Sequence, residues 1–223
     1  MNIYAQKKLE NTMKKRKHQL PSIHEFDIQI DLTKLQNECD KISASFTDVV
    51  TANPALCMNH MDLVKNVYDN FEQINLTELN GEELEHTTDV KERIRRREET
   101  RYNKPTELYT GSYFEEIVNM FSAPAMRVRI TKLEVGKIIP FHIDYDPTYA
   151  TRVIIPIYTN PQVKNLFKRK DALEEYHLEA GKAYFLNTGF AHSVENNSDA
   201  PRIALMFSLD GQEDLVINDG SEI

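Results

Sequence analysis

Two histidines and one aspartate of this sequence could together bind a metal ion. His142 and Asp144 stand two positions apart, after a predicted strand, a turn at Gly136 and an apolar approach. Alternate residues of a strand share one face, so both side chains can reach the same ion. A histidine from a distant strand would complete a 2-His-1-carboxylate set, which leaves positions open on Fe(II) for substrate and dioxygen. A set without a thiolate suits Fe(II) better than structural zinc.

The second histidine has two candidates. His177 lies in a short predicted strand and is expected to be an ordinary structural or exposed histidine. His192 is followed on the next predicted strand by Arg202, and a guanidinium beside the metal suits a dicarboxylic co-substrate. A further His-x-Asp stretch, His60-Met-Asp62, precedes a helical pattern. There a spacing of two directs the side chains to different faces, so we expect it to be structural.

The elements that must position these residues differ between the two halves of the chain. Residues 25–32 alternate as a strand, and apolar residues then recur at helical spacing over 35–46 and 63–71. Ser112 opens a capping-box pattern before a third helical stretch that ends at Phe121. From Met126 onward the period changes to two. Short strands separated by turns at this spacing predict a sandwich or barrel.

Composition and charge limit the class of protein. The chain has 223 residues and a net charge of −8, which disfavours nucleic-acid binding, although residues 1–20 form a basic tail. The charged run over residues 91–104, which includes Glu99, predicts a solvated helix face with Glu–Arg pairs. No apolar run approaches the roughly 18 residues of a membrane helix. Two cysteines, with no secretory signal, predict a reducing, cytoplasmic compartment.

A set of spacings extends the metal-site pattern. Thr131 lies five residues before Gly136, which lies six before His142. Arg152 opens a β-branched strand, and His192-Ser-Val is followed by Arg202. Together these residues resemble the Fe(II)/2-oxoglutarate-dependent oxygenases, and within them the aspartyl/asparaginyl β-hydroxylase-like group. The resemblance covers residues 127–215, under half of the chain.

The resemblance implies a fold and a set of roles. The resemblance implies a double-stranded β-helix (jelly roll, cupin-like) over 124–223. The sequence patterns add a mostly helical region, 21–123, packed against it and a mobile tail, 1–20, so the expected fold is α+β. Fe(II) would be held by His142, Asp144 and His192. Arg202 and Thr131 would bind the distal carboxylate of 2-oxoglutarate. Arg152 would bind the other end of that co-substrate or the carboxylate of the substrate.

Further residues are assigned from their position alone. Five polar or aromatic side chains are expected to line the substrate mouth: Tyr145, Tyr149, Tyr158, Asn160 and Asn196. Arg127 and Arg129 share a face with Thr131, and two such strand arginines predict a solvated face. Ile154 stands where the family's strand usually has a second histidine. The presence of Asp144 resembles the bacterial members that hydroxylate free amino acids such as proline, and it argues against a halogenase.

The resemblance implies a dioxygenase that uses O2 to hydroxylate an unactivated C–H, with succinate and CO2 as co-products. We expect a small-molecule substrate, above all a free amino acid; an Asp, Asn or other side chain of a protein is the alternative. A metal-dependent cupin-type enzyme without 2-oxoglutarate would share the triad but would not need Arg202. A binding module on the same barrel, with residues 1–18 docking on nucleic acid, is the third hypothesis. The helical region leaves a homodimer open.

Overall fold

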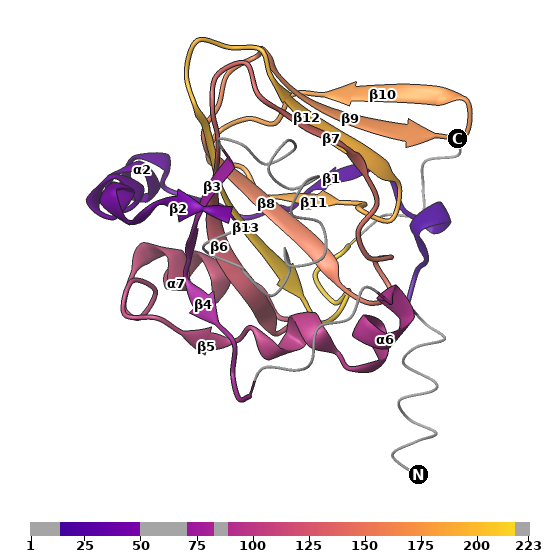
Figure 1. The fold of residues 1–223 in the computed structure, drawn as a ribbon, viewed down its shortest axis with the longest axis horizontal. Helices are drawn as coiled ribbons and strands as arrows, with labels where there is room; N and C mark the ends of the chain where they lie inside the picture. Colours follow the sequence, from indigo (N-terminus) through magenta and orange to yellow (C-terminus); the bar gives the residue numbers. More distant parts are fainter. Residues whose placement is uncertain (1–13, 50–70, 83–88, 217–223) are drawn as a thin grey trace.

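Two β-sheets face each other in the computed structural model, which describes residues 14–49, 71–82 and 89–216 (Figure 1). The strands are β1 (Ile23–Glu25), β2 (Thr47–Asp48), β3 (Phe71–Asn75), β4 (Thr77–Glu78), β5 (Lys104–Pro105), β6 (Ala125–Leu133), β7 (Ile138–His142), β8 (Thr151–Tyr158), β9 (Val163–Arg169), β10 (Ala172–Tyr176), β11 (Tyr184–Leu186), β12 (Ala191–Asn196) and β13 (Arg202–Leu209). The helices are α2 (Leu32–Lys41), α6 (Val90–Arg95) and α7 (Tyr113–Val118), with 3-10 turns η1 (Lys17–Gln19), η2 (Ser43–Ser45) and η3 (Glu98–Arg101).

The order of the strands is that of a jelly roll. The seven-stranded sheet runs β1-β11-β8-β13-β6-β3-β2, and the four-stranded sheet runs β10-β9-β12-β7. From β6 to β13 the chain passes back and forth between the two sheets, and every pair is antiparallel. This alternation closes two sheets around one interior. The strands expected after Pro124 are therefore confirmed.

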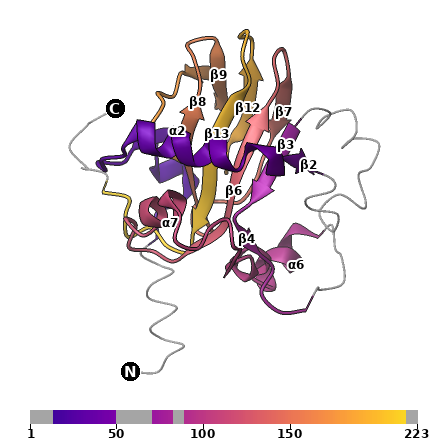
Figure 2. The same ribbon diagram turned by 90° about the vertical axis from the view of Figure 1, so that its left-hand side faces the viewer.

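Helices α2 and α7 cover the outer face of the seven-stranded sheet (Figure 2). Leu35 of α2 and Phe114 of α7 are fully buried in one apolar cluster with Leu205 and Phe207 of β13. Ser112 caps α7 as the sequence predicts, since its Oγ accepts a hydrogen bond from the Glu115 N–H at 3.3 Å. No helix in the described part of the chain is long and apolar enough to cross a membrane.

The prediction of a mostly helical region over 21–123 is confirmed only in part, because the described residues hold short strands, β1 to β5, as well as helices α2, α6 and α7. Strands β1 and β3 extend the seven-stranded sheet by pairing with β11 and β6. The strand expected over 25–32 is not formed over that range: β1 spans Ile23–Glu25. Asp31 then caps α2, which begins at Leu32. Of the helical pattern over 63–71, only Phe71 is described, and it opens β3. The division into three regions stays a prediction.

The polar face of the long strands points between the sheets. Along β13, Leu205 and Phe207 pack under the helices, whereas Ala204 joins an apolar cluster with Phe167 of the four-stranded sheet. Arg202 and Ser208 share the face of Ala204, because alternate residues of a strand point the same way. Both are buried. The interior of the jelly roll is therefore partly polar, as a binding site for a charged ligand must be.

A bulge in β6 adds a further basic residue to this interior. The pairing of β6 with β13 shifts between Met206 and Ser208, which leaves Arg127 as the extra residue. Arg127 has a φ of 52°, a left-handed backbone that is uncommon outside glycine. Bulges of this kind redirect side chains next to functional sites.

Candidate functional site

His142, Asp144 and His192 form a cluster that could hold a metal ion. One potential ligand atom from each lies within 4.8 Å of the others, and no other such group occurs among the described residues. His142 of β7 and His192 of β12 are direct cross-strand partners, with ring centroids 4.2 Å apart. Asp144 follows β7, where its N–H donates to the Thr188 carbonyl at 3.0 Å. The structure thus brings together the three residues that the sequence singled out.

Backbone carbonyls fix the tautomer of both imidazoles. Nδ1 of His142 lies 2.8 Å from the Pro140 carbonyl oxygen, and Nδ1 of His192 lies 3.0 Å from that of Phe190. A carbonyl oxygen can only accept, so each Nδ1 carries the proton and each Nε2 keeps its lone pair. Such outer hydrogen bonds are the usual support of metal-binding histidines. The donor set fits Fe(II).

The protonation states also suit a metal. Burial and the neighbouring His142 lower the pKa of His192 to about 4, so its imidazole is neutral at pH 7. Burial works to raise the pKa of Asp144, but Arg152 and the two histidines outweigh it and hold that pKa below its usual value. With a side chain 37% exposed, Asp144 is the most accessible part of the cluster. The neutral imidazole of His192 and the ionised carboxylate of Asp144 are ready to bind a cation.

Arg202 lies inside the jelly roll without a carboxylate partner among the described residues. It is 2% exposed, and its Nη1 donates to Thr131 Oγ1 at 3.3 Å. Burial lowers its pKa to about 10, and no ion pair compensates the charge within this part of the chain. An unpaired buried guanidinium is costly, so the site is suited to an anion that arrives from outside. The predicted neighbours Arg202 and Thr131 are in contact.

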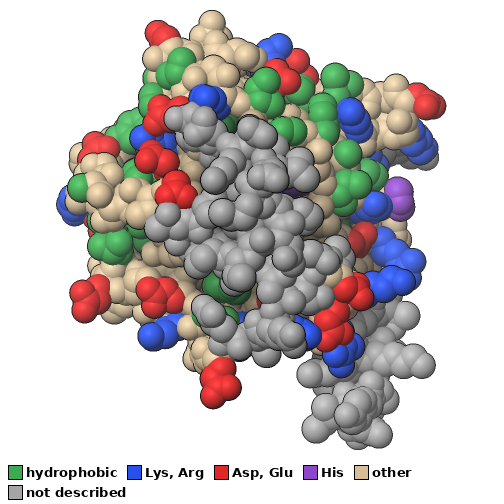
Figure 3. Space-filling view, viewed as in Figure 1, with side chains coloured by type: hydrophobic (Ala, Val, Ile, Leu, Met, Phe, Trp, Pro, Cys, Tyr) green, Lys and Arg blue, Asp and Glu red, His purple; other side chains and the backbone are tan. Residues whose placement is uncertain are grey.

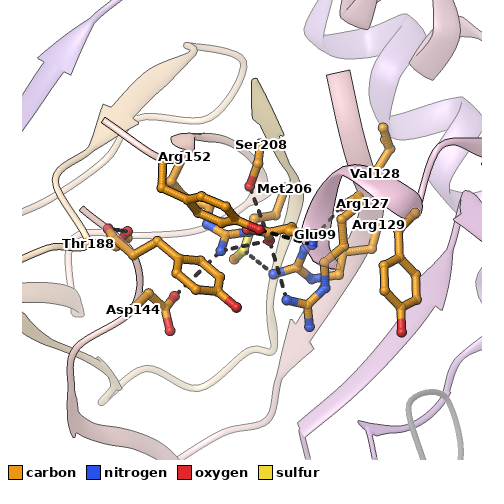
Figure 4. A network of polar contacts seen from close by, with 12 residues as sticks. Glu99, Arg127, Val128, Arg129, Asp144, Arg152, Thr188, Met206 and Ser208 are labelled. Atoms are coloured by element: carbon orange, nitrogen blue, oxygen red, sulfur yellow. Dashed lines mark hydrogen bonds and ion pairs between the residues drawn. The ribbon is translucent and has the colours of Figure 1, made fainter. Parts of the chain in front are cut away.

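Arg152 belongs to a second buried network (Figure 4). Its Nη2 lies 3.2 Å from Glu99 Oε1 and 3.6 Å from Asp144 Oδ2. Glu99 lies between Arg152 on one side and Arg127 with Arg129 on the other. Arg127 Nη1 reaches Glu99 Oε1 at 3.4 Å, and Ser208 Oγ donates to the same oxygen at 3.3 Å. Arg152 thus links the metal cluster to Glu99.

Two expectations about this network are wrong. Arg127 and Arg129 do not form a solvated face: Arg129 is 8% exposed and donates to the Arg127 carbonyl and to Met206 Sδ. Glu99, expected in a solvated helix face, is 3% exposed. The same charged run does hold the expected surface pairs, since Glu92 pairs with Arg95 and Arg96. Local sequence offers no signal that separates Glu99 from its charged neighbours.

Two of the five expected mouth residues lie beside this network. Tyr145 and Tyr149 are buried, with ring centroids 4.4 Å apart, and pack with Met126. Tyr149 Oη accepts a hydrogen bond from the Glu99 N–H at 3.2 Å. These two tyrosines belong to the loop that follows Asp144, and through them this loop packs beside the network.

The other three expected mouth residues lie away from the metal cluster. Tyr158 donates to Asp40 Oδ1 of α2 at 2.8 Å, and Asn160 accepts from the Gln162 N–H within its own turn. Asn196 is fully buried, and its Nδ2 donates to three carbonyls that hold a turn together. His177 is exposed. His60 and Asp62 lie outside the described residues.

Apolar side chains gather over the four-stranded sheet (Figure 3). Phe141 and Ile143, which flank His142, are both exposed, as is Ile138 earlier in β7. Nζ of Lys168 lies 3.9 Å from the centroid of the Phe141 ring. The ligand-bearing strand therefore has apolar side chains at its outer surface as well as polar side chains inside.

Comparisons with known proteins found one family model and several solved structures that are similar to this chain. Residues 108–210 match the family model described as aspartyl/asparaginyl beta-hydroxylase. A 2OG-Fe(II) oxygenase family oxidoreductase from Burkholderia pseudomallei aligns with a TM-score of 0.40 at 12% identity, over 84% of this chain and 95% of its own. A cupin domain from Bordetella pertussis aligns with a TM-score of 0.31 at 18% identity, over 40% of this chain and 85% of its own. No curated protein matches the sequence.

The matched segment holds every residue of the candidate metal cluster and two of the buried arginines, Arg152 and Arg202. The resemblance that the spacings indicate is confirmed by this match. Residues 108–210 of this chain are therefore similar to the aspartyl/asparaginyl β-hydroxylase family.

Proposed function

We propose that the protein is an Fe(II)- and 2-oxoglutarate-dependent dioxygenase that hydroxylates an unactivated C–H of a free amino acid or another small molecule. The observation that carries the proposal is the pairing of two features inside one jelly roll. One is a His-Asp-His cluster with both Nε2 atoms free to bind a metal. The other is Arg202, a buried guanidinium without a carboxylate partner among the described residues.

Each feature has a separate part in the reaction. Bound iron with 2-oxoglutarate and dioxygen would supply the oxidising power to remove hydrogen from a C–H bond, and succinate and CO2 would be the co-products. His142, Asp144 and His192 would hold that ion and keep positions open on it. Arg202 would fix the distal carboxylate of the co-substrate, and Thr131 would orient the guanidinium.

The walls of the interior would keep water from the reaction. Ile154, Phe167 and Ala204 form an apolar cluster between the sheets. Phe167 also stacks on the imidazole of His192, with ring centroids 5.7 Å apart. A dry wall beside the metal strengthens the charge interactions that hold the co-substrate. Ile154 is apolar, but Arg152, two residues earlier on the same face of β8, adds a polar side chain to this wall.

The test is succinate formation in air with Fe(II) and 2-oxoglutarate, with free amino acids added one at a time. We expect turnover by the wild type, none by His142→Ala, and unchanged turnover by His177→Ala, an exposed histidine outside the cluster. Arg202→Met should lose turnover, whereas Arg95→Met, which removes an arginine of the surface pair with Glu92, should not.

Other outcomes would favour another function. A wild type that binds iron yet forms no succinate, even without a substrate, would favour a cupin-type enzyme that does not use 2-oxoglutarate. Succinate formation that protein or peptide substrates accelerate, and free amino acids do not, would favour hydroxylation of an Asp, Asn or other protein side chain.

A further inference from the structure

The carboxylate of Glu99 uses only one of its two oxygens. Oε1 receives Arg127, Arg152 and Ser208, at 3.4, 3.2 and 3.3 Å. Oε2 is buried and has no hydrogen-bond partner among the described residues. A buried acceptor without a donor costs free energy, so its presence beside a candidate active site calls for an explanation.

Two guanidinium donors of the same network are also buried without a partner in the described part of the chain. They are Arg152 Nη1 and Arg127 Nε. The network therefore offers one free acceptor and two free donors to a single ligand. Arg152 Nη2 lies 3.6 Å from Asp144 Oδ2, and a ligand bound to Arg152 would therefore lie next to the metal cluster.

The charges of the network do not balance. Arg127, Arg129 and Arg152 bring three positive charges, against the carboxylates of Glu99 and Asp144. Arg129 makes its contacts with a carbonyl and a thioether, and burial together with Arg127 and Arg152 lowers its pKa well below the usual value. This local excess of guanidinium groups favours a carboxylate as the group that accepts from their free donors.

An α-amino acid satisfies both requirements. Its carboxylate would accept from the free guanidinium donors, where positive charge is in excess. Its ammonium group would donate to Glu99 Oε2. A plain carboxylic acid would leave Glu99 Oε2 without a donor, and a plain amine would leave the guanidinium donors without an acceptor. Resting on the function proposed above, we propose that Glu99 and Arg152 recognise the ammonium and carboxylate groups of a free α-amino acid substrate.

Glu99 lies outside the segment that matches the family model, which begins at residue 108. It comes from η3, which packs against β6 and reaches the network from outside the jelly-roll core. Its N–H donates to Tyr149 Oη at 3.2 Å, so both its backbone and its side chain are held. In this proposal Glu99 is a specificity residue that lies before the matched segment in the sequence.

The test measures binding rather than turnover. The full chain is loaded with Zn(II) in place of Fe(II) and with 2-oxoglutarate, and the twenty L-amino acids are titrated by calorimetry. The tightest ligand is then compared with the matching carboxylic acid that lacks the α-amino group. We expect the wild type to bind the amino acid at least tenfold more tightly than the acid.

Glu99→Gln separates recognition from structural support. We expect this variant to lose at least tenfold in affinity for the amino acid and less than twofold for the des-amino acid. Glu98→Gln, its neighbour outside the network, should change neither. Equal losses for both ligands in Glu99→Gln would mean that Glu99 merely holds Arg152, and would overturn the proposal.

Three further outcomes are decisive. If Glu99→Gln does not fold, equal affinity of the wild type for the amino acid and the des-amino acid would still overturn the proposal. A wild type that binds Zn(II) and 2-oxoglutarate but none of the amino acids would overturn it and leave the proposed function standing. A wild type that binds neither Zn(II) nor 2-oxoglutarate would overturn both.

Discussion

Two buried arginine sites share the interior face of the seven-stranded sheet, and they differ in what balances their charge. Arg202 donates to Thr131, and no carboxylate pairs with it among the described residues. Arg152 lies within 4 Å of both Glu99 and Asp144. Ser208, which binds Glu99, stands six residues after Arg202 on β13, or about 20 Å along the strand. One site is open to an anion, and the other is largely compensated from within.

Under the proposed function, this difference would let a single interior hold two small molecules, the co-substrate and the substrate. A guanidinium that must bind a free dicarboxylate is most useful without a carboxylate of its own. A guanidinium that must be held in one orientation beside a metal benefits from an internal partner, because the partner removes its freedom before the substrate arrives. The predictions below test this contrast, beginning with the largest expected effect.

Arg202→Met should weaken 2-oxoglutarate binding to the Zn(II)-loaded protein by about 100-fold, because a buried charge-assisted contact contributes roughly 3 kcal/mol. The free energy of unfolding should stay the same or rise, since the substitution removes an uncompensated buried charge. Calorimetry and urea denaturation measure the two quantities. Unchanged affinity would show that the open arginine does not serve the co-substrate.

Arg152→Met should affect stability strongly and 2-oxoglutarate affinity weakly, the reverse of Arg202→Met. It breaks the buried pair with Glu99, so it should lower the free energy of unfolding by about 3 kcal/mol. Its effect on 2-oxoglutarate affinity should be much smaller than that of Arg202→Met. Urea denaturation of both variants makes the comparison. Equal stability of the two would remove the distinction between an open site and a compensated one.

The stability of the compensated site should depend on pH. Burial works to raise the pKa of Glu99, but Arg152, Arg127 and Arg129 outweigh it and hold that pKa below its usual value. Such a carboxylate stabilises the fold above its unfolded pKa of about 4.3, and the contribution is lost as the pH falls through the folded value. The stability advantage of wild type over Glu99→Gln should therefore shrink below about pH 4. Denaturation at several pH values checks this, and a constant difference would contradict it.

The smallest effects come from the two hydroxyl groups that support the arginine sites. Thr131→Val removes the acceptor of Arg202 and should raise the dissociation constant of 2-oxoglutarate about fivefold. Ser208→Ala removes a donor to Glu99 and should cost about 1 kcal/mol of stability with little change in that constant. Calorimetry and denaturation of both variants are the measurements. The account would be contradicted if Thr131→Val lowered only the stability and Ser208→Ala raised only the dissociation constant of 2-oxoglutarate.

The sequence predicts that His142, Asp144 and His192 come together, because their arrangement depends on strand geometry. His142 and Asp144 are neighbours at the end of one strand, and His192 follows a turn signal at Gly189. The contact of Arg202 with Thr131 also follows from strand alternation once the two strands pair. Period-two patterns carry both pieces of information.

Glu99 could not be predicted, because its role depends on tertiary packing. Residues 91–104 contain several charges of both signs, and the pairs of Glu92 with Arg95 and Arg96 follow from helical spacing. Nothing in that spacing shows that η3 turns Glu99 into the jelly roll. Arg127 was equally hidden, since a bulge brings it to the interior and bulges leave little trace in a sequence.

The central claim is that the open arginine, Arg202, binds the co-substrate and that Arg152 does not. A crystal structure of the protein with Mn(II) and 2-oxoglutarate tests it most directly. We predict the metal between His142, Asp144 and His192, with the distal carboxylate of 2-oxoglutarate on Arg202 and Thr131. A distal carboxylate on Arg152 or Arg127, with Arg202 left without an anion, would contradict the account.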